Sequence, residues 1–265
     1  MSNKINYKQK KEGKVAQFIT KVLMTDGNKV NYKSKREEGA AQFVTKVHQL
    51  VCLEIFMITL FCFFMYGFKL AKFVSPEVIC VAVFISWILH SILIYIDIIK
   101  NVSVQNIIAI VIYILNIVLN GIYIVGILQI AAKTGLYLGN IILSAAIITM
   151  GVYLYAILYE KKNRDKPTNK KIMTMISWGT CLTLLLQLLL KDGIVMLIID
   201  VITVILMSLS VIFDVKRLGE EYKEQMELNS KTNAFTLMVE QTEVVVTDLI
   251  LNFVAIIKLW LDSQD

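Results

Sequence analysis

Apolar residues fill long windows of this chain instead of recurring with the period of a surface helix or strand. From residue 47 onward, near-continuous apolar runs of about 20 residues alternate with short polar segments, and a helix of that length crosses a bilayer. A soluble domain would show its apolar residues at helical or strand spacing. We therefore expect an all-α polytopic membrane protein with seven transmembrane helices, at residues 47–68, 78–99, 106–130, 136–159, 172–190, 194–213 and 244–261.

Two of these spans have special features. The fifth and sixth are joined by little more than residues 191–193, which indicates a tight helical hairpin. The seventh is the least apolar, because it carries Asp248, Asn252 and Lys258. It either crosses the bilayer or dips in and returns, and the side on which the carboxyl terminus lies depends on that choice.

Composition and charge add the orientation. The chain has 265 residues, is 57% hydrophobic and has a mean hydropathy of +0.66. Of its 27 Lys and Arg residues, 22 lie in the amino-terminal tail and the loops on the same side, against 5 on the other side. Positive loops stay in the cytosol, so the amino terminus is expected there. The net charge of +6 follows from this asymmetry, so the lipid bilayer is the expected partner and no nucleic acid is needed.

The polar amino-terminal part is expected to be a basic cytosolic tail, residues 1–46, ahead of a membrane domain at 47–265. Residues 3–22 match residues 28–47 at a fixed offset, which indicates a local duplication, because two copies cannot build a solenoid. The tail is too polar to contain a signal peptide, so we expect the first span to act as its own insertion signal.

Cysteine spacing indicates neither a disulfide framework nor a metal cluster. All four cysteines fall inside predicted spans, and we interpret them as small packing residues: Cys52, Cys62, Cys80 and Cys181. No cofactor is expected.

Asp214 and Asp248 are the strongest candidates for a functional site. A carboxylate at membrane depth costs about 2.5–3.5 kcal/mol on insertion scales, so it is rarely present without a use. The charge pattern places both near the cytosolic ends of two consecutive helices, where they approach each other. Two close carboxylates in a poorly hydrated place cannot both ionise cheaply, so the pair suits pH sensing. It could also offer hard oxygen ligands to a divalent cation such as calcium.

Further polar residues suggest a possible ion pathway. Asp200 and Ser210 recur at intervals of three and four with Thr203, Met207 and Asp214, so they share one face of the sixth span. Candidate pathway residues are Asp200, Glu54, Ser210 and Asn252.

Other polar residues in the apolar stretches are expected to have structural roles. Glu240 and Glu243 come just before the seventh span, where acidic residues at a helix start are ordinary, and no function is assigned to them. We expect four amides to form interhelical hydrogen bonds: Asn116, Asn120, Asn140 and Gln187.

Three short motifs carry a family resemblance: residues 42–47 (QFVTKV), 213–216 (FDVK) and 247–253 (TDLILNF). They resemble the Phe-x-x-Lys-Val-Tyr, Tyr-Asp-Thr-Gln and seventh-helix aspartate segments of the Bax inhibitor family, which includes the lifeguard and Golgi anti-apoptotic proteins. The resemblance covers about residues 39–262.

The resemblance implies a seven-helix fold with a central last helix. It also implies a calcium leak whose opening is tied to protonation of Asp214 and Asp248, with calcium as the permeant ion. Residence in the endoplasmic reticulum or Golgi and suppression of cell death, with apoptosis-regulating membrane proteins as partners, are implied as well. The chain departs from the family pattern at Val215 and Lys216, which replace Thr-Gln, and in a second span without the arginine of some bacterial members.

Three alternatives to a channel arise from the residues. An intramembrane aspartyl protease also places one aspartate on each of two helices, but its Gly-x-Gly-Asp and Pro-Ala-Leu motifs are missing here, so we expect no enzyme. A secondary transporter is disfavoured because no repeat of half the spans and few helix breakers occur. A non-conducting regulator that acts through protein partners stays open, with the aspartates then serving only to hold helices together.

Overall fold

The computed structural model describes residues 32–133, 138–164, 166–189, 193–228 and 233–263. Regular structure in these ranges is entirely helical. The elements are α2 (Tyr32–Gly67), η1 (Leu70–Phe73), α3 (Pro76–Ile94), η2 (Ile96–Ile98), α4 (Val102–Ala132), α5 (Leu138–Asn163), α6 (Lys170–Leu189), α7 (Gly193–Leu228) and α8 (Ala234–Asp262). The first copy of the tail repeat, residues 3–22, and the predicted turn before Gly193 lie outside the described residues.

Each predicted span coincides with one long helix, except that the last residues of the second continue in η2. Six of the seven long helices are long and apolar enough to cross a membrane. The remaining one, α6, has 20 residues and so a length of about 30 Å at 1.5 Å per residue, which matches the hydrocarbon thickness. It begins with Lys170 and Lys171, and these two charges reduce its mean hydropathy.

Three helices exceed the predicted bounds by about ten residues or more. The helix of the first span already begins at Tyr32, α7 continues past the predicted end of its span to Leu228, and α8 begins at Ala234. The extra turns are more polar than the segments that they extend, but they continue the helices without a break. The position of a residue along its helix must therefore be counted from these ends.

Short polar side chains cap the starts of the helices. Ser75 precedes Pro76 at the first turn of α3 and accepts a hydrogen bond from the backbone N–H of Val78. Asn101 caps α4 by accepting from Ser103 N–H at 3.0 Å. Such residues satisfy backbone N–H groups that a helix leaves unpaired at its start.

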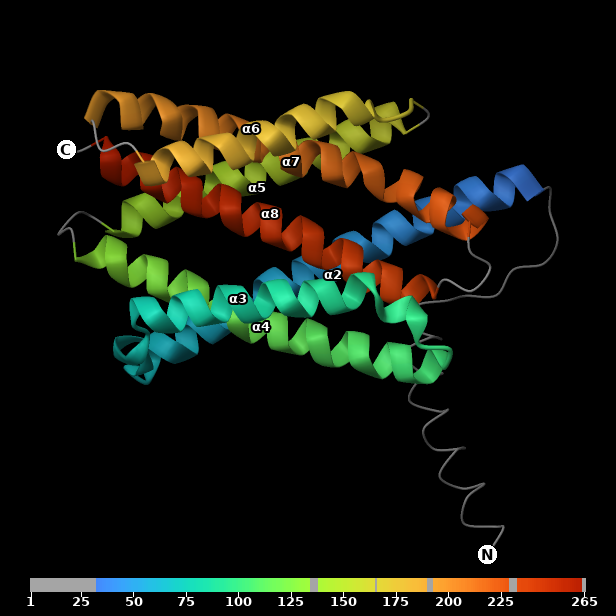
Figure 1. Cartoon of the computed structure of the whole chain (residues 1–265), viewed down its shortest axis with the longest axis horizontal. Helices are drawn as coiled ribbons and strands as arrows, with labels where there is room; N and C mark the ends of the chain where they lie inside the picture. Colours follow the sequence, from blue (N-terminus) through green and yellow to red (C-terminus); the bar gives the residue numbers. More distant parts are fainter. Residues whose placement is uncertain (1–31, 134–137, 165, 190–192, 229–232, 264–265) are drawn as a thin grey trace, which may run out of the picture.

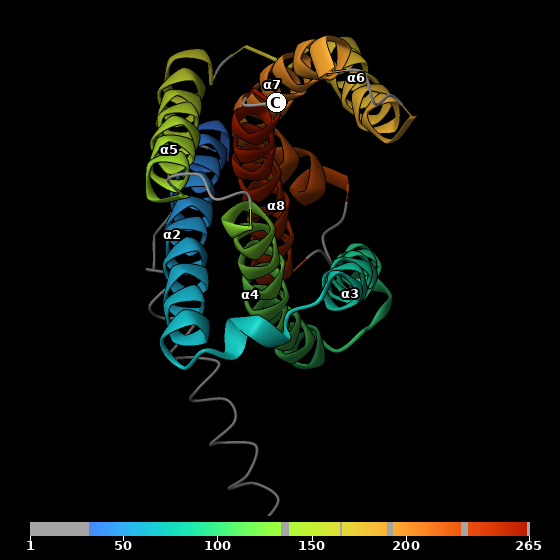
Figure 2. The same cartoon turned by 90° about the vertical axis from the view of Figure 1, so that its left-hand side faces the viewer.

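The last helix lies at the centre of the bundle (Figures 1 and 2). It packs against α2, α3, α4, α5 and α7, as the end-on view shows. The expected central last helix is confirmed. Polar groups on any face of α8 therefore lie between helices, where they need hydrogen-bond or ion-pair partners.

A large apolar core joins α2, α5, α7 and α8. Its fully buried members include Val47, Val51, Ala156, Val215 and Val246. On the opposite side of α8, α4 approaches its neighbours closely at two glycines. A Cβ atom at Gly121 would collide with the ring of Phe61, and one at Gly126 would collide with Ile79.

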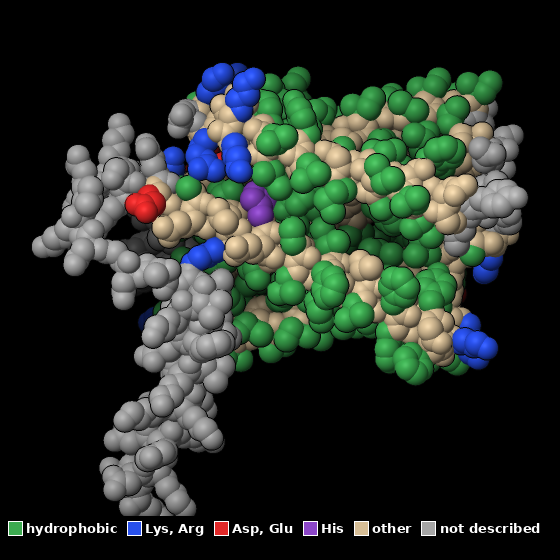
Figure 3. Space-filling view, turned by 180° about the vertical axis from the view of Figure 1, so that it is seen from behind, with side chains coloured by type: hydrophobic (Ala, Val, Ile, Leu, Met, Phe, Trp, Pro, Cys, Tyr) green, Lys and Arg blue, Asp and Glu red, His purple; other side chains and the backbone are tan. Residues whose placement is uncertain are grey.

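Large apolar side chains cover the outside of the bundle. Phe63 is 74% exposed and Trp178 is 72% exposed, and many Leu, Ile and Val residues accompany them. Figure 3 shows this apolar surface as a broad band, with Lys and Arg side chains at the two ends of the bundle. A surface of this kind is stable only against lipid, so the chain is a multi-pass integral membrane protein in contact with the bilayer.

The cysteines are free, as expected, but most of them do not pack inside the bundle. Cys52, Cys80 and Cys181 are exposed on the apolar outer surface, and Cys62 is half-buried. The interpretation of all four as packing residues was therefore wrong for three of them. Apolar content alone cannot separate a lipid-facing position from one that faces another helix.

Candidate functional site

Asp214 of α7 and Asp248 of α8 lie side by side between the two helices. Their carboxyl groups are within hydrogen-bonding reach of each other, and the hydroxyl of Ser210 reaches Asp248 as well. Ser210 Oγ lies 3.4 Å from Asp214 Oδ2. A second oxygen of Asp248, Oδ2, is buried and has no hydrogen-bond partner among the described residues. Three of the predicted residues, Asp214, Asp248 and Ser210, are thus brought together in one half-buried cluster. The two acidic residues of this cluster are called the aspartate pair below.

The aspartate pair lies at mid-length of its helices rather than at their tips. Asp214 comes 14 residues before Leu228, the end of α7, and Asp248 comes 14 residues after Ala234, the start of α8. At 1.5 Å per residue, each is about 21 Å from that end of the helix. The expectation of a pair near the helix ends was therefore wrong, because both helices extend well beyond their most apolar segments.

The basic residues that follow Asp214 point away from the pair. Lys216 is 8% exposed and its ammonium group donates to the carbonyl oxygen of Pro167 at 3.4 Å, in the connection between α5 and α6. Arg217 forms an ion pair with Glu221 one turn further along α7. The lysine that departs from the family pattern is thus engaged elsewhere and does not neutralise the aspartates.

Asn252, one turn after Asp248, connects three helices. Its Nδ2 donates to Ser208 Oγ of α7 at 2.8 Å, and its Oδ1 accepts from Thr149 Oγ1 of α5 at 3.2 Å. The residue is completely buried. Both ends of the amide are therefore occupied by packing contacts, which fits a structural role better than a place on an ion pathway.

Asp200 lies 14 residues before Asp214 on α7, in a separate cluster at the other end of the interface with α8. It is 1% exposed, and its Oδ1 is 2.7 Å from the ammonium group of Lys258. Lys258 also pairs with Asp262 at 2.6 Å, and Gln187 of α6 donates to Asp200 at 2.6 Å. The acidic side chain is thus held in an ion-pair network. The hydrogen bond from Gln187 confirms the expectation that this residue connects helices.

Glu54 lies in a third cluster, between α2, α4 and α8. It is completely buried and accepts from Asn120 Nδ2 at 3.5 Å. Its charged neighbour is Glu243, which is 1% exposed and accepts from Asn116 Nδ2 at 2.8 Å. The two asparagines connect helices as expected, whereas Asn140 is exposed on α5.

Glu243 was misjudged by sequence reasoning. It does not stand at a helix start, because α8 begins nine residues earlier at Ala234, and its carboxyl group is enclosed in the bundle. A usable signal was present: Glu243 lies directly before the apolar run VVV and five residues before Asp248. Five residues turn a helix by about 140°, so the two acidic groups leave α8 on different faces.

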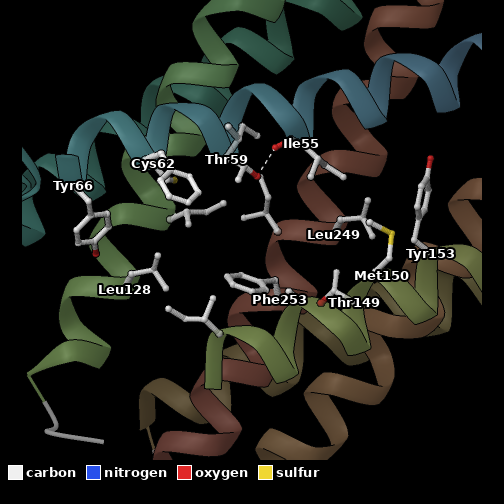
Figure 4. Close-up of a pocket in the computed structure, with 16 residues that line it drawn as sticks. Ile55, Thr59, Cys62, Tyr66, Leu128, Thr149, Met150, Tyr153, Leu249 and Phe253 are labelled. Carbon is white, nitrogen blue, oxygen red and sulfur yellow. Dashed lines mark hydrogen bonds between the residues drawn. The ribbon is translucent and has the colours of Figure 1, made fainter. Parts of the chain in front are cut away.

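An apolar cavity of about 600 Å³ lies between α2, α4, α5 and α8 (Figure 4). Leu128, Leu249 and Phe253 point into it, and the hydroxyl-bearing side chains of Thr59 and Thr149 lie at its wall. None of the acidic residues discussed above contributes to this lining. The cavity is therefore an apolar space and not a hydrated route for ions.

The aspartate pair by itself offers few ligands for a metal ion. Within the described residues, no group of three or more His, Cys, Asp or Glu side chains could hold a metal. Calcium takes six to eight oxygen ligands, so a cation bound between two carboxylates and one hydroxyl would keep several water molecules. The arrangement suits transient contact with a hydrated cation better than a resident metal.

Comparison with known proteins gives one finding. A family model described as "Inhibitor of apoptosis-promoting Bax1" matches residues 40–259, from inside α2 to the last turn of α8. No curated protein matches the chain significantly. The match includes all or most of each of the seven long helices, together with the aspartate pair, Glu54, Glu243 and Asp200. The family consists of membrane proteins that are not enzymes. This chain belongs to the Bax inhibitor family.

Proposed function

We propose that this protein is a proton-sensitive calcium leak channel of an intracellular membrane, with Asp214 and Asp248 as its gate. The observation that carries the proposal is the direct contact of two carboxyl groups between α7 and α8. The two basic side chains that follow Asp214, Lys216 and Arg217, are engaged elsewhere and do not neutralise the pair. Membership of a family named for the inhibition of a death-promoting protein supports an anti-apoptotic role.

The mechanism follows from proton sharing. With one proton between them, the two carboxyl groups can form a hydrogen bond that holds α7 against α8. Loss of that proton leaves two negative charges in contact in a poorly hydrated place, and their repulsion favours separation of the helices. A separated pair would present carboxylate oxygens to calcium, which prefers such ligands. Calcium flux should therefore rise as the pH rises through the loss of the shared proton.

Orientation and location belong to the same proposal. Many Lys and Arg side chains lie at the end of the bundle where α5 and α7 end and α6 begins, as Figure 3 shows at one edge of the apolar band. The positive-inside rule then favours a cytosolic position for this end and for the amino terminus. We place the protein in the endoplasmic reticulum or Golgi membrane, on the basis of the family resemblance.

The test is calcium flux into liposomes that contain the purified full-length protein, measured at neutral and at acidic pH. We expect flux at neutral pH to exceed flux at acidic pH. The double variant Asp214→Asn/Asp248→Asn should remove this difference, because neither side chain can then lose a proton. Glu224→Gln is the matched control, since it makes the same chemical change at an exposed position of α7.

A pH response that survives in the double variant would refute the gate. Absence of flux from the wild-type protein at every pH would refute the channel itself. A response lost equally in Glu224→Gln would show that the effect is not specific to the aspartate pair.

A non-conducting regulator is the second candidate. It is favoured by the hydrogen bonds of Asn252 and the ion pair of Lys258, which show that many polar groups at the centre of the bundle already hold helices together. In that case calcium flux would not be needed for function, and a variant that conducts no calcium would still protect cells from death. Cell survival and flux measured on the same variants distinguish the two functions.

A further inference from the structure

Glu54 and Glu243 form a second pair of acidic side chains. Glu243 lies on a different face of α8 from Asp248, so this pair is separate from the aspartate pair. Glu54 is 0% exposed and Glu243 is 1% exposed. They come from α2 and α8, and each accepts a hydrogen bond from one of two asparagines that lie one turn apart on α4, so the two carboxyl groups are neighbours. Two enclosed carboxylates of like charge are too costly to persist without a compensating positive charge, which either protons or a cation can supply.

The surroundings of the two glutamates supply no such charge. Among the described residues, their polar contacts are the amides of Asn116 and Asn120, both from α4. Tyr113, also on α4, lies close to both carboxyl groups, but its hydroxyl donates to the backbone oxygen of Leu50 at 3.0 Å. The carboxylates are thus surrounded by neutral polar groups, which can orient a cation but cannot replace one.

Each glutamate also keeps one oxygen free. Oε2 of Glu54 and Oε1 of Glu243 are buried and have no hydrogen-bond partner among the described residues. Buried polar atoms are normally paired, so such an atom indicates a missing partner. Because the two free oxygens do not hydrogen-bond to each other, one proton shared between the glutamates would not give both oxygens a partner in this geometry.

We infer that the two glutamates and the two asparagines form a site for one calcium ion, enclosed between α2, α4 and α8. The two carboxylates offer four oxygens to the ion. The two asparagines offer two more, because rotation of a side-chain amide by about 180° exchanges the positions of its NH2 group and its oxygen. Six oxygens are at the lower end of the range of about six to eight that calcium takes. Magnesium, which holds its water tightly and demands near-ideal octahedral geometry, fits such a site less well.

Ser86 of α3 orients part of this site. In this structure its hydroxyl donates to Asn116 Oδ1 at 3.1 Å, and Asn116 Nδ2 donates to Glu243. When the amide rotates to present Oδ1 to the ion, Nδ2 turns toward Ser86, whose hydroxyl oxygen can accept that hydrogen bond. The asparagine therefore transmits the position of α3 to the acidic pair. The bound ion would connect α2, α4 and α8 in the same way that Asn252 connects α5, α7 and α8.

The inference does not depend on the proposed channel activity, and the test separates the two. Full-length protein carrying Asp214→Asn/Asp248→Asn, which lacks the aspartate pair, is purified in lipid nanodiscs and titrated with calcium at alkaline pH by calorimetry. We expect binding of one calcium ion per chain and a rise of the melting temperature with calcium. Magnesium should compete only weakly.

Glu54→Gln and Glu243→Gln, each added to that background, should weaken calcium binding by about tenfold or more, since one of the two charged ligands is lost. Glu160→Gln is the matched control, because Glu160 is also buried (2% exposed) but already forms an ion pair with Arg164 at 2.6 Å. Glutamine keeps the size of the side chain and its ability to bond the asparagines, and elution as a single species verifies folding.

A second readout does not require the acidic groups to be changed. Terbium, a calcium analogue, should show emission sensitised by Tyr113, and Tyr113→Phe should reduce that emission while leaving calcium affinity unchanged. The inference is overturned if the background protein binds no calcium at any pH, which would leave a proton as the only ligand. It is also overturned if the Glu→Gln variants bind calcium as tightly as the background.

Discussion

The ammonium group of Lys258 on α8 lies 2.7 Å from Oδ1 of the buried Asp200 on α7. Ten residues separate Lys258 from Asp248, so this ion pair fastens the α7–α8 interface at a point well away from the aspartate pair. The helices α7 and α8 are thus joined by an ion pair of opposite charges at one position along their length and by a contact between two acidic side chains at another. Movement between α7 and α8 should accordingly be easier at the aspartate pair than at the ion pair.

Lys258→Met should destabilise the protein, because it keeps the side-chain length but leaves Asp200 buried without a cation. Breaking a buried pair costs about 3–5 kcal/mol, and we expect about 2 kcal/mol here because Lys258 is partly exposed. Thermal unfolding in detergent measures the effect, with Lys133→Met at the exposed end of α4 as the control. The loss should shrink in acid, where Asp200 can take up a proton, and a loss that is the same at every pH would contradict this explanation.

Asp248→Asn should remove a pH dependence of stability. If the folded aspartate pair retains one proton that the unfolded chain releases, the folded state binds more protons, and wild-type stability falls as the pH rises. The variant cannot share that proton, so its melting temperature should vary less over the same pH range. Melting curves of both proteins from acidic to alkaline pH provide the measurement, and parallel curves would argue against a shared proton.

Asn252 and Ser208 should be energetically coupled. Hydrogen bonds between membrane helices contribute about 0.6 kcal/mol on average, with a maximum near 1.7, and this one spans 2.8 Å. A double-mutant cycle with Asn252→Ala and Ser208→Ala should give a coupling energy in that range. A control cycle combines Asn252→Ala with Thr174→Ala. Thr174 donates a hydrogen bond to the backbone of its own helix, so this cycle should show no coupling to Asn252. Strict additivity of Asn252→Ala and Ser208→Ala would show that the contact contributes nothing.

Gly121→Val should destabilise the contact between α4 and α2. Its Cβ atom would collide with the ring of Phe61, and overpacking of this kind costs about 1–3 kcal/mol. Gly151→Val on α5 is the matched control, since no heavy atom lies within 4 Å of a Cβ atom there. Both substitutions place a β-branched residue in a membrane helix, so the difference in melting temperature isolates the packing effect. Adding Phe61→Leu to the Gly121→Val variant should recover part of the lost stability, because the smaller side chain relieves the collision.

The amino-acid sequence by itself determined the number and order of the long helices, because hydrophobic length is a local property that can be read one span at a time. It also singled out Asp214 and Asp248, whose cost in an apolar stretch is equally local. Their meeting was inferable because consecutive antiparallel helices are neighbours in space.

Only the tertiary structure decided which distant polar groups share a cluster. Glu54 meets Glu243 across most of the chain length, and Asp200 meets Lys258, because α8 is inserted between helices that precede it in sequence. The rotation of each helix about its own axis also depends on packing against all neighbours at once. For that reason apolar content could not show that Cys52 faces outward or that Glu243 faces inward, whereas the assembled bundle shows both.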